Sequence, residues 1–275
     1  MKKNLDTILY VVVLYNQILK KTNIYKSLLN RIPAHQIFVW DNSTTNRLNS
    51  DLYSYGIQYV YSQQNMGVSF PYNRAFDFAS QKGFQWIMLL DQDTTFADTF
   101  LGIVESAIHQ YPEIKIFCPL HQLSGGSYLS PAKFFMKFTR PTHKKVLGII
   151  NVSKYAIINS GLLVDVATFR RAGGYNEKVF LDYSDFQFLD RLAKFDSKAF
   201  CLSSVCLQDF SNDCMENDKV LKRFTLFCQS LKGCEHNGAW EAIEYHLVVL
   251  KRCLSLIYRL KSFQPFITYY KYYIK

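Results

Sequence analysis

The chain has 275 residues, of which 49% are hydrophobic, and a formal net charge of +10. This size predicts one large α/β domain, or one domain with an appendage. No apolar run reaches the ~18 residues that span a bilayer, and the N-terminus lacks a signal-peptide core. Seven cysteines without a CxxC pair indicate reduced thiols and a cytoplasmic location.

Strands and helices are expected to alternate in the first 110 residues. The predicted strands cover 8–14, 37–40, 57–61 and 86–90, and the predicted helices cover 18–30, 71–82 and 98–110. Alternation at this spacing is typical of βαβ units and predicts an α/β fold with a parallel sheet.

The strand at 86–90 runs directly into Asp91, Gln92 and Asp93. Open α/β sheets bind their ligands at the carboxyl ends of such strands. Two carboxylates this close repel each other, so a bound cation would keep both ionised, and hard oxygen ligands suit Mg²⁺ or Mn²⁺. An ordinary Asp-rich turn gives the same pattern.

Three further polar motifs follow predicted strands. They are Tyr15-Asn16, Asp41-Asn42-Ser43 and Asn65-Met66-Gly67. If the strands are parallel neighbours, all four strand ends converge on one edge of the sheet. There Asp41 would accept hydrogen bonds from a base or ribose, although its motif also fits a simple turn.

Beyond residue 120 the pattern is less regular. Residues 128–150 are expected to form a loop or hairpin that lines a site, and 157–164 a strand that Gly161 interrupts, which suggests close approach of a ligand or another backbone. Helices are predicted at 166–172, at 185–195 and from about 218 onward.

Asp182 and Asp185 lie at the expected start of the helix at 185–195. The helix dipole stabilises an ionised carboxylate there, and such a carboxylate can act as a general base. An N-cap is the structural alternative, and it is compatible with catalysis.

Two segments carry most of the positive charge. Residues 131–154 have six Lys or Arg and no Asp or Glu, and residues 219–275 have ten against three. The amphipathic stretch at 242–275 suits either an anionic membrane surface or a helical cap on the catalytic domain. No nucleic-acid partner is expected, because no recognised nucleic-acid fold accompanies these residues.

The order of motifs resembles family 2 glycosyltransferases with a GT-A fold, and is closest in pattern to bacterial rhamnosyltransferases of polysaccharide biosynthesis. The resemblance covers about residues 8–212. The motifs that carry it are Val11–Asn16, Val39–Ser43, Asn65-Met66-Gly67 with Asn73, Leu89–Asp93, Asn159-Ser160-Gly161, Gly173–Glu177, and Phe180–Asp185 with Arg191.

The resemblance implies a Rossmann-like, mostly parallel sheet flanked by helices. It implies a catalytic domain at 1–215, with a nucleotide-sugar half at 1–120 and an acceptor half at 121–215, and a helical extension at 216–275. The implied reaction is inverting transfer of a sugar, with rhamnose from dTDP-rhamnose as the best expectation and a UDP-hexose as the alternative donor. The implied acceptor is a cell-surface glycan or a polyprenyl-linked glycan, which fits peripheral contact with the inner face of the cell membrane.

The resemblance also implies roles for individual residues. Asp93, supported by Asp91, would hold Mg²⁺ or Mn²⁺ on the donor diphosphate. Asp185 would be the general base, with Asp182 as second choice, and Arg191 would lie on the acceptor side. The nucleotide-sugar site would be formed by Tyr15, Asn16, Asp41, Asn42, Asn65, Gly67, Asn73, Asp91, Gln92, Asn159, Ser160 and Gly161.

Two positions depart from the family pattern. A histidine that often supplies a further metal ligand is replaced by Gln208 or Asp209, so Asp209 is a weak candidate ligand. Gln187 stands where an acidic residue is frequent. An inactive glycan-binding subunit is therefore an alternative, and a haloacid-dehalogenase-like phosphatase with Asp91 as nucleophile is another. The latter family places its motif on the first strand, whereas here about ninety residues precede it.

Overall fold

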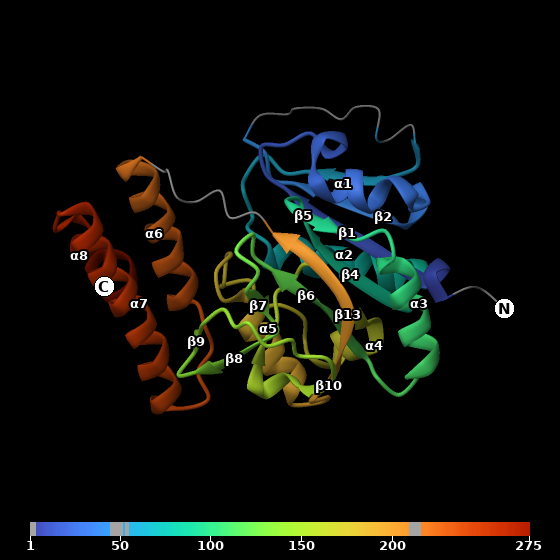
Figure 1. The fold of residues 1–275 in the computed structure, drawn as a ribbon. Helices are drawn as coiled ribbons and strands as arrows, with labels where there is room; N and C mark the ends of the chain where they lie inside the picture. Colours follow the sequence, from blue (N-terminus) through green and yellow to red (C-terminus); the bar gives the residue numbers. More distant parts are fainter. Residues whose placement is uncertain (1–3, 45–51, 53–54, 209–215) are drawn as a thin grey trace.

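The computed structural model describes residues 4–44, 52, 55–208 and 216–275. A ten-stranded sheet forms the centre of the molecule, with helices on both faces (Figure 1). Its main path runs β10-β13-β6-β12-β4-β1-β2-β3.

The four strands predicted in the first half form one parallel block. They are β1 (Ile8–Leu14), β2 (Ile37–Asp41), β3 (Gln58–Tyr61) and β4 (Trp86–Asp91). β1 lies between β2 and β4, and β3 pairs with β2. The predicted α/β fold with a parallel sheet is therefore confirmed, and the carboxyl ends of these strands share one edge.

The second half extends this sheet beyond β4. Its strands on the main path are β6 (Ile116–Gln122), β10 (Gly148–Asn151), β12 (Leu162–Asp165) and β13 (Lys198–Gln208). β12 is antiparallel to both β4 and β6, and β13 is parallel to β6. Strands β3, β2, β1, β4, β6 and β13 therefore point the same way, so the sheet is mostly parallel. Two short strands, β5 (Thr94–Phe96) and β7 (Tyr128–Ser130), pair with β13 and β6.

Each face of the sheet is covered by its own hydrophobic core. Alternate residues of β1 face opposite sides, as the period of a strand requires. Leu9 and Val11 join a core with α2 (Ser69–Lys82), α4 (Val166–Arg171) and α5 (Ser184–Ala193). Ile8 and Val12 join the other, with α1 (Asn23–Ser27) and α3 (Phe100–Gln110). The strand ends are thus held between two packed layers.

Two predicted elements differ from the structure. The helix expected at 18–30 is divided into two 3₁₀ turns around the short α1. The Thr22 hydroxyl accepts a hydrogen bond from the Tyr25 N–H, and such caps begin a helix rather than continue one. The strand expected at 157–164 begins only at Leu162, because Gly161 has a φ of +77°.

A small second sheet, in the order β11-β8-β9, stands beside the main one. It consists of β8 (Ala132–Phe135), β9 (Phe138–Thr139) and β11 (Tyr155–Ala156). β8 and β9 form a hairpin whose turn residues, Met136 and Lys137, have φ angles of 50° and 59°. Two residues with positive φ match the twist of a two-residue hairpin, so the expected loop or hairpin at 128–150 contains a true hairpin.

The C-terminal helices α6 (Asn217–Lys232), α7 (Ala239–Leu260) and α8 (Gln264–Tyr269) pack together beside the α/β part (Figure 1). Their shared core includes Phe224, Tyr245 and Val249, and Val179 and Tyr183 of the α/β part pack against it. Within the described part of the chain, no helix is both long and apolar enough to cross a membrane.

Candidate active site

Hydrogen bonds join the ends of the parallel strands. The Gln92 amide oxygen accepts from the Tyr15 N–H at 2.9 Å, which connects the ends of β4 and β1. The Ser43 hydroxyl accepts from the Asn16 N–H at 2.9 Å, which connects β2 and β1. The Asn42 side chain donates to the Gly67 carbonyl at 2.7 Å. The four sequence motifs therefore form one continuous surface.

Asp41 is completely buried at the end of β2. Its carboxylate accepts from the Ser43 N–H at 2.9 Å, from the Ser43 hydroxyl, and from the Tyr59 hydroxyl at 2.7 Å. A carboxylate has about four acceptor positions, so these three hydrogen bonds use most of the accepting capacity of Asp41. They also fix the conformation of the turn.

The motif after β3 is fixed against the loop that precedes α5. Gly67 has a φ of +69°, and a β-carbon at this position would lie 2.0 Å from the Phe180 carbonyl oxygen. The same oxygen accepts from the Val68 N–H at 2.9 Å. Asn65 accepts from the Gly67 N–H at 3.0 Å. This contact places the 180–185 segment beside the strand ends.

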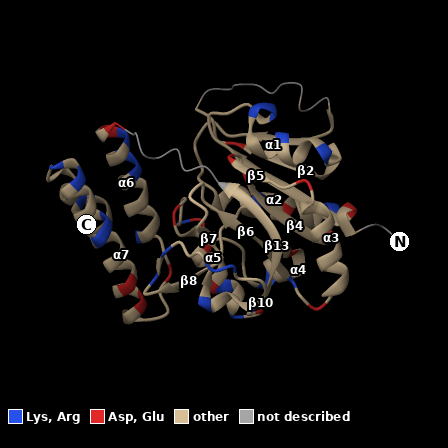
Figure 2. Cartoon of the chain, viewed as in Figure 1, with Lys and Arg blue, Asp and Glu red and all other residues tan. Residues whose placement is uncertain are grey.

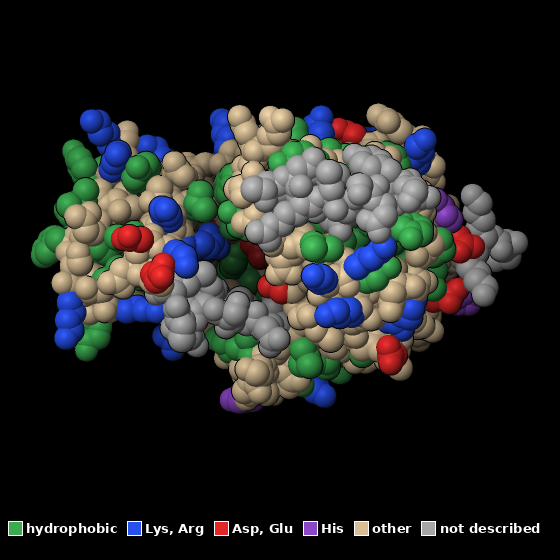
Figure 3. Space-filling view, turned by 90° about the horizontal axis from the view of Figure 1, so that it is seen from above, with side chains coloured by type: hydrophobic (Ala, Val, Ile, Leu, Met, Phe, Trp, Pro, Cys, Tyr) green, Lys and Arg blue, Asp and Glu red, His purple; other side chains and the backbone are tan. Residues whose placement is uncertain are grey.

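An acidic cleft of about 290 Å³ opens at this junction. Its lining includes Asp91 from β4, Asp182 from the loop before α5 and Asp185 from the first turn of α5, together with Asn159 and with Arg223 of α6. In Figure 3, acidic and basic side chains face each other across the hollow beside the C-terminal helices. The cleft therefore brings together carboxylates predicted from two distant motifs.

Asp91 is the most perturbed of these carboxylates. Its pKa is raised to about 7, chiefly by burial and also by the charges of Asp93 and Asp185, while a hydrogen bond from the Tyr72 hydroxyl at 3.5 Å acts in the opposite direction. The Asp91 N–H donates to the Ser160 hydroxyl at 3.0 Å. Mutual repulsion of three carboxylates is the electrostatic condition that a divalent cation relieves.

The donor set fits a hard divalent cation only in part. Asp93 is half-buried beside Asp91, and both supply oxygen ligands of the type that Mg²⁺ and Mn²⁺ prefer. Within the described ranges, no three His, Cys, Asp or Glu side chains form a ready metal cluster. Gln208 ends β13, and its backbone pairs with Thr94. Asp209, the candidate third ligand, lies outside the described residues.

Asp185 lies in the first turn of α5, partly buried in the cleft. Its pKa is raised to about 6, chiefly by burial and also by the Asp182 charge, while the hydrogen bond from the Phe186 N–H, at 2.8 Å, acts in the opposite direction. Asp182 itself forms a bidentate ion pair with Arg223, whose Nη2 is 2.7 Å from Oδ1. Of the two, Asp185 is the carboxylate without a cationic partner among the described residues.

The Asn159-Ser160-Gly161 turn packs against the cleft, and Asn159 lines it. The Asn159 amide oxygen accepts from the Tyr175 hydroxyl at 2.6 Å. Buried His121 contacts the Ser160 carbonyl through Nε2 at 2.7 Å, and burial lowers its pKa to about 4, so it is neutral at pH 7 and donates this bond. At Gly161 a β-carbon would meet Pro119 at 2.7 Å, so protein packing accounts for this glycine.

Of the predicted site residues that the structure describes, only Asp91, Asn159, Asp182 and Asp185 line the cleft. Among the residues outside its lining, three that the family resemblance singles out have clear structural contacts. Asn73 holds the 173–177 loop through the Tyr175 backbone, with bonds of 2.8 and 3.0 Å. Arg191 binds Glu235 and the Gly174 carbonyl. Gln187 is buried and donates to the Tyr245 hydroxyl at 2.9 Å. All three connect α5 or α2 to loops or to the C-terminal helices.

Sequence reasoning missed Tyr72, Thr139 and Arg223 at this site. Tyr72 is buried on α2, and its hydroxyl reaches Asp91. The sequence could have indicated this residue, because it lies near the start of a predicted helix that follows a strand end. Thr139 and Arg223 line the cleft from the hairpin and from α6. No local pattern marks them, because both reach the cleft through long-range packing.

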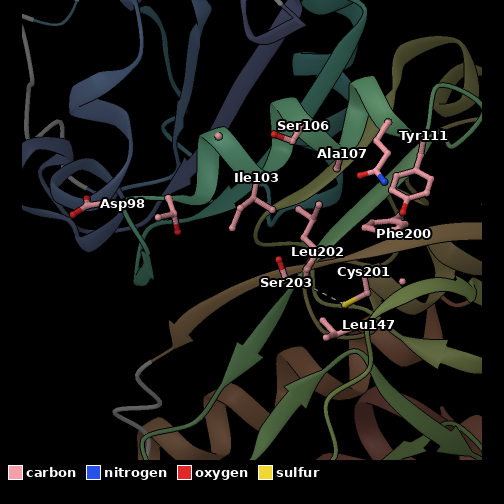
Figure 4. Close-up of a pocket in the computed structure, with 14 residues that line it drawn as sticks. Asp98, Ile103, Ser106, Ala107, Tyr111, Leu147, Phe200, Cys201, Leu202 and Ser203 are labelled. Atoms are coloured by element: carbon pink, nitrogen blue, oxygen red, sulfur yellow. Dashed lines mark hydrogen bonds between the residues drawn. The ribbon is translucent and has the colours of Figure 1, made fainter.

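A larger cavity, of about 690 Å³, lies elsewhere, between α3 and strands β10 and β13 (Figure 4). Its labelled walls are mostly apolar, with Ile103, Tyr111, Phe200 and Leu202 pointing into it. Asp98 is its one carboxylate among the lining residues, and none of the predicted site residues lines it. Its chemistry does not suit a diphosphate, so the smaller acidic cleft is the candidate active site.

Solved structures resemble this fold at low sequence identity. A structure of GalNAc-T7 with UDP, GalNAc and Mn²⁺ superposes with a TM-score of 0.57 at 14% identity, over 82% of this chain and 46% of that one. A structure of TarS from S. aureus gives 0.54 at 15% identity, over 90% and 43%. A shorter TarS, residues 1–349 in complex with UDP-GlcNAc, gives 0.52 at 13% identity, over 90% and 73%. The chain thus spans less than half the length of the first two.

No curated protein matches this sequence. The profile of the family described as Glycosyl transferase family 2 matches residues 10–163, which is more than half of the chain. The match includes most of β1, all of β2 to β4 and the Asn159-Ser160-Gly161 turn. The chain therefore belongs to glycosyl transferase family 2.

Proposed function

We propose that the protein is an inverting glycosyltransferase that moves a sugar from a nucleoside-diphosphate donor to an acceptor hydroxyl. In this reaction the acceptor oxygen attacks the anomeric carbon as the bond to the diphosphate oxygen breaks. The acceptor proton passes to the Asp185 carboxylate, and the nucleoside diphosphate leaves. The observation that supports this proposal is the position of Asp185 in one cleft with Asp91, because it puts a base beside the donor edge.

The donor nucleoside is assigned to the ends of β1 and β2. The Tyr15 side chain is 46% exposed there, so its ring can stack on a base. Asn16 accepts from the Thr44 N–H at 3.4 Å beside it. Asp41 shapes the turn beneath, and Gln92 joins this region to the diphosphate end of the cleft.

Asp93 and Asp91 are the residues that would hold Mg²⁺ or Mn²⁺. When bound, such a cation supplies positive charge that stabilises the leaving diphosphate. GalNAc-T7, which has a similar fold, was solved with Mn²⁺ and UDP. The negative charges of Asp91, Asp93 and Asp185 repel one another, so a cation bound among them would be electrostatically favourable.

The motif order favours dTDP-rhamnose as donor, with a UDP-hexose as the alternative. TarS, whose fold is similar, was solved with UDP-GlcNAc, which supports the alternative. A cell-surface or polyprenyl-linked glycan is the proposed acceptor. Thermal stabilisation by each nucleotide sugar with Mn²⁺ separates the donors, because a bound ligand raises the apparent stability.

Peripheral membrane contact through the C-terminal helices fits such an acceptor. Large apolar side chains are exposed there, with Tyr258 88% and Phe263 73% accessible. Lys251, Arg259 and Lys271 are interspersed with them. Exposed aromatic rings among cations suit the interface of an anionic bilayer.

Donor consumption in the presence of Mn²⁺ and a panel of acceptors tests the function. Acceptor-dependent release of nucleoside diphosphate, lost in Asp185→Asn, is expected. Donor binding without release across the panel would point to an inactive subunit. Release of inorganic phosphate from a phosphate ester without any nucleotide sugar would instead favour a phosphatase.

A further inference from the structure

A second feature, separate from the acidic cleft, is a basic groove along the β8–β9 hairpin. Two hollows of about 600 and 500 Å³ share Lys133 and Arg140 as wall residues. We define the basic groove by its five cations, Lys133, Arg140, Lys144, Lys145 and Lys251. Figure 2 shows Lys and Arg residues around β8 and β10.

The cations of the basic groove lack carboxylate partners within the described ranges. None of the five takes part in a salt bridge there. Lys251 and Lys145 instead lie over aromatic rings, 4.6 Å from the centroid of Phe138 and 6.0 Å from that of Tyr128. Unneutralised cations gathered around two hollows that share wall residues attract an anionic ligand.

Lys137, at the tip of the same hairpin, provides the contrast. It is buried, and its Nζ lies 2.7 Å from Asp190 and 2.9 Å from Glu241. Its carbonyl accepts from the Tyr183 hydroxyl at 3.0 Å. The one buried lysine of the segment is thus neutralised twice, and it anchors the hairpin to α5 and α7. The groove cations are therefore displayed on a fixed support.

The basic groove is continuous with the candidate active site. Thr139 lines the acidic cleft with Asp185, and the next residue, Arg140, lines both hollows of the groove. Phe134, Phe135 and Phe138 form aromatic walls, and Phe135 is 77% exposed. Aromatic faces pack against sugar rings, and cations bind phosphates.

We propose that the basic groove binds phosphate groups of the acceptor, so that this enzyme's acceptor is a phosphorylated glycan or a glycan on a diphosphate carrier. This inference rests on the proposed function, since it takes Asp185 as the point where the acceptor hydroxyl reacts. The acceptor then extends from the cleft past Thr139, with its saccharide on the phenylalanine rings and its phosphates on Arg140, Lys133 and the lysines at 144 and 145.

Calorimetric titration with inorganic tripolyphosphate, in the presence of a chelator, tests the binding directly. The groove variant combines Lys133→Gln, Arg140→Gln and Lys145→Gln, and the control combines Lys26→Gln, Lys82→Gln and Lys178→Gln, which are exposed lysines outside the groove. Both variants lose the same charge. The groove variant is expected to bind about tenfold more weakly than the wild type, and the control variant to bind normally.

Two further ligands separate the sources of phosphate. Stronger binding of pyrophosphate than of a glycerol-phosphate oligomer would identify a diphosphate carrier, and the reverse order would identify phosphodiesters along the glycan; either result supports the proposal. Equal loss in both variants would overturn it, because net charge would then explain binding. Unchanged tripolyphosphate binding with loss of binding to phosphatidylglycerol vesicles would also overturn it, in favour of a membrane surface.

The measurement of tripolyphosphate binding does not depend on whether the protein transfers a sugar. Asp185→Asn is expected to keep tripolyphosphate binding while it loses transfer. If the wild type proves inactive but the groove variant still loses binding, the proposed function fails and the phosphate site stands.

Discussion

Arg223 of α6 forms a bidentate ion pair with Asp182, three residues before Asp185. The C-terminal helices therefore contribute a side chain to the cleft, and they hold the carboxylate nearest in sequence to the candidate base. The pair also explains why Asp185 is the better candidate, because the ion pair keeps Asp182 occupied.

Replacing Arg223 is expected to change the pH dependence of transfer. In Arg223→Met the Asp182 charge is no longer compensated, so it raises the pKa of Asp185 further, and the acidic limb of the rate profile moves up by about half a unit to one unit. The double variant Asp182→Asn/Arg223→Met should move it back. Lys222→Met, on the same helix, is the control. A purely structural role would lower the rate without moving the limb.

Transfer is expected to require ionised Asp185. Because burial raises the pKa of this carboxyl to about 6, the rate should be constant above that pH and fall as the pH drops through it. Asp185→Asn should lower kcat by about 10²–10⁴-fold, the usual contribution of a general base. Initial rates from pH 5 to 8, at about unit intervals, measure both effects. A variant with the wild-type rate would remove Asp185 from this role.

Asp91 and Asp93 are expected to respond differently to substitution. Asp91→Asn removes a buried charge, so the metal-free protein at pH 8 should melt a few degrees higher, about the shift that 1 kcal/mol gives. Asp93→Ala removes one of the charges that repel Asp91, so we expect a smaller rise in the metal-free Tm. Both should lose the stabilisation that Mn²⁺ gives the wild type. Thermal melts with and without Mn²⁺ compare them, and retained Mn²⁺ stabilisation in Asp93→Ala would contradict the assignment.

Gly67 is expected to tolerate no side chain. In Gly67→Ala the new β-carbon would lie against the Phe180 carbonyl, with a strained φ of +69°, so we expect a loss of about 2–4 kcal/mol in the free energy of unfolding. Gly56→Ala is the matched control, since Gly56 has a φ of +80° and nothing within 4 Å of the added carbon. Urea unfolding of both separates the contact from the φ strain. Equal losses would mean that the Phe180 contact contributes nothing.

The exposed aromatics of the C-terminal helices should govern membrane contact. The variant Tyr258→Ser/Phe263→Ser is expected to bind vesicles with phosphatidylglycerol several-fold more weakly, since each ring buries apolar area at the interface. Phe135→Ser, on the hairpin, is the control with a similarly exposed ring. Co-sedimentation measures the bound fraction, and equal binding of all three proteins would exclude the helices as the contact surface.

The first half of the fold follows from local patterns in the sequence. β1 and β4 are continuous apolar runs, and each ends at a polar motif, so their order and their common edge could be predicted. β6 could not, because Pro119 and His121 interrupt its apolar character and its stability comes from its place between β12 and β13.

The candidate site, like the fold, could be predicted from the sequence only in part. Asp91 and Asp185 stand at element ends that the sequence marks, and the structure puts both in one cleft. Arg223 is 41 residues from its partner Asp182, and only the packing of α6 against the loop before α5 brings them together. The glycine that interrupts the strand pattern at Gly161, and Gly67 of the motif after β3, are both required by packing between protein segments.

The anchoring of Lys137 has a consequence for synthesis of the chain. Its partner Glu241 and the cleft residue Arg223 are both made after the whole α/β sheet has been translated. A nascent chain that ends before α7 has the lysine at the hairpin tip with only one of its two carboxylates, and a chain that ends before α6 also lacks the Arg223 that pairs with Asp182. The ion pairs that fix the hairpin tip and Asp182 are therefore completed only when the helical part has folded onto the sheet.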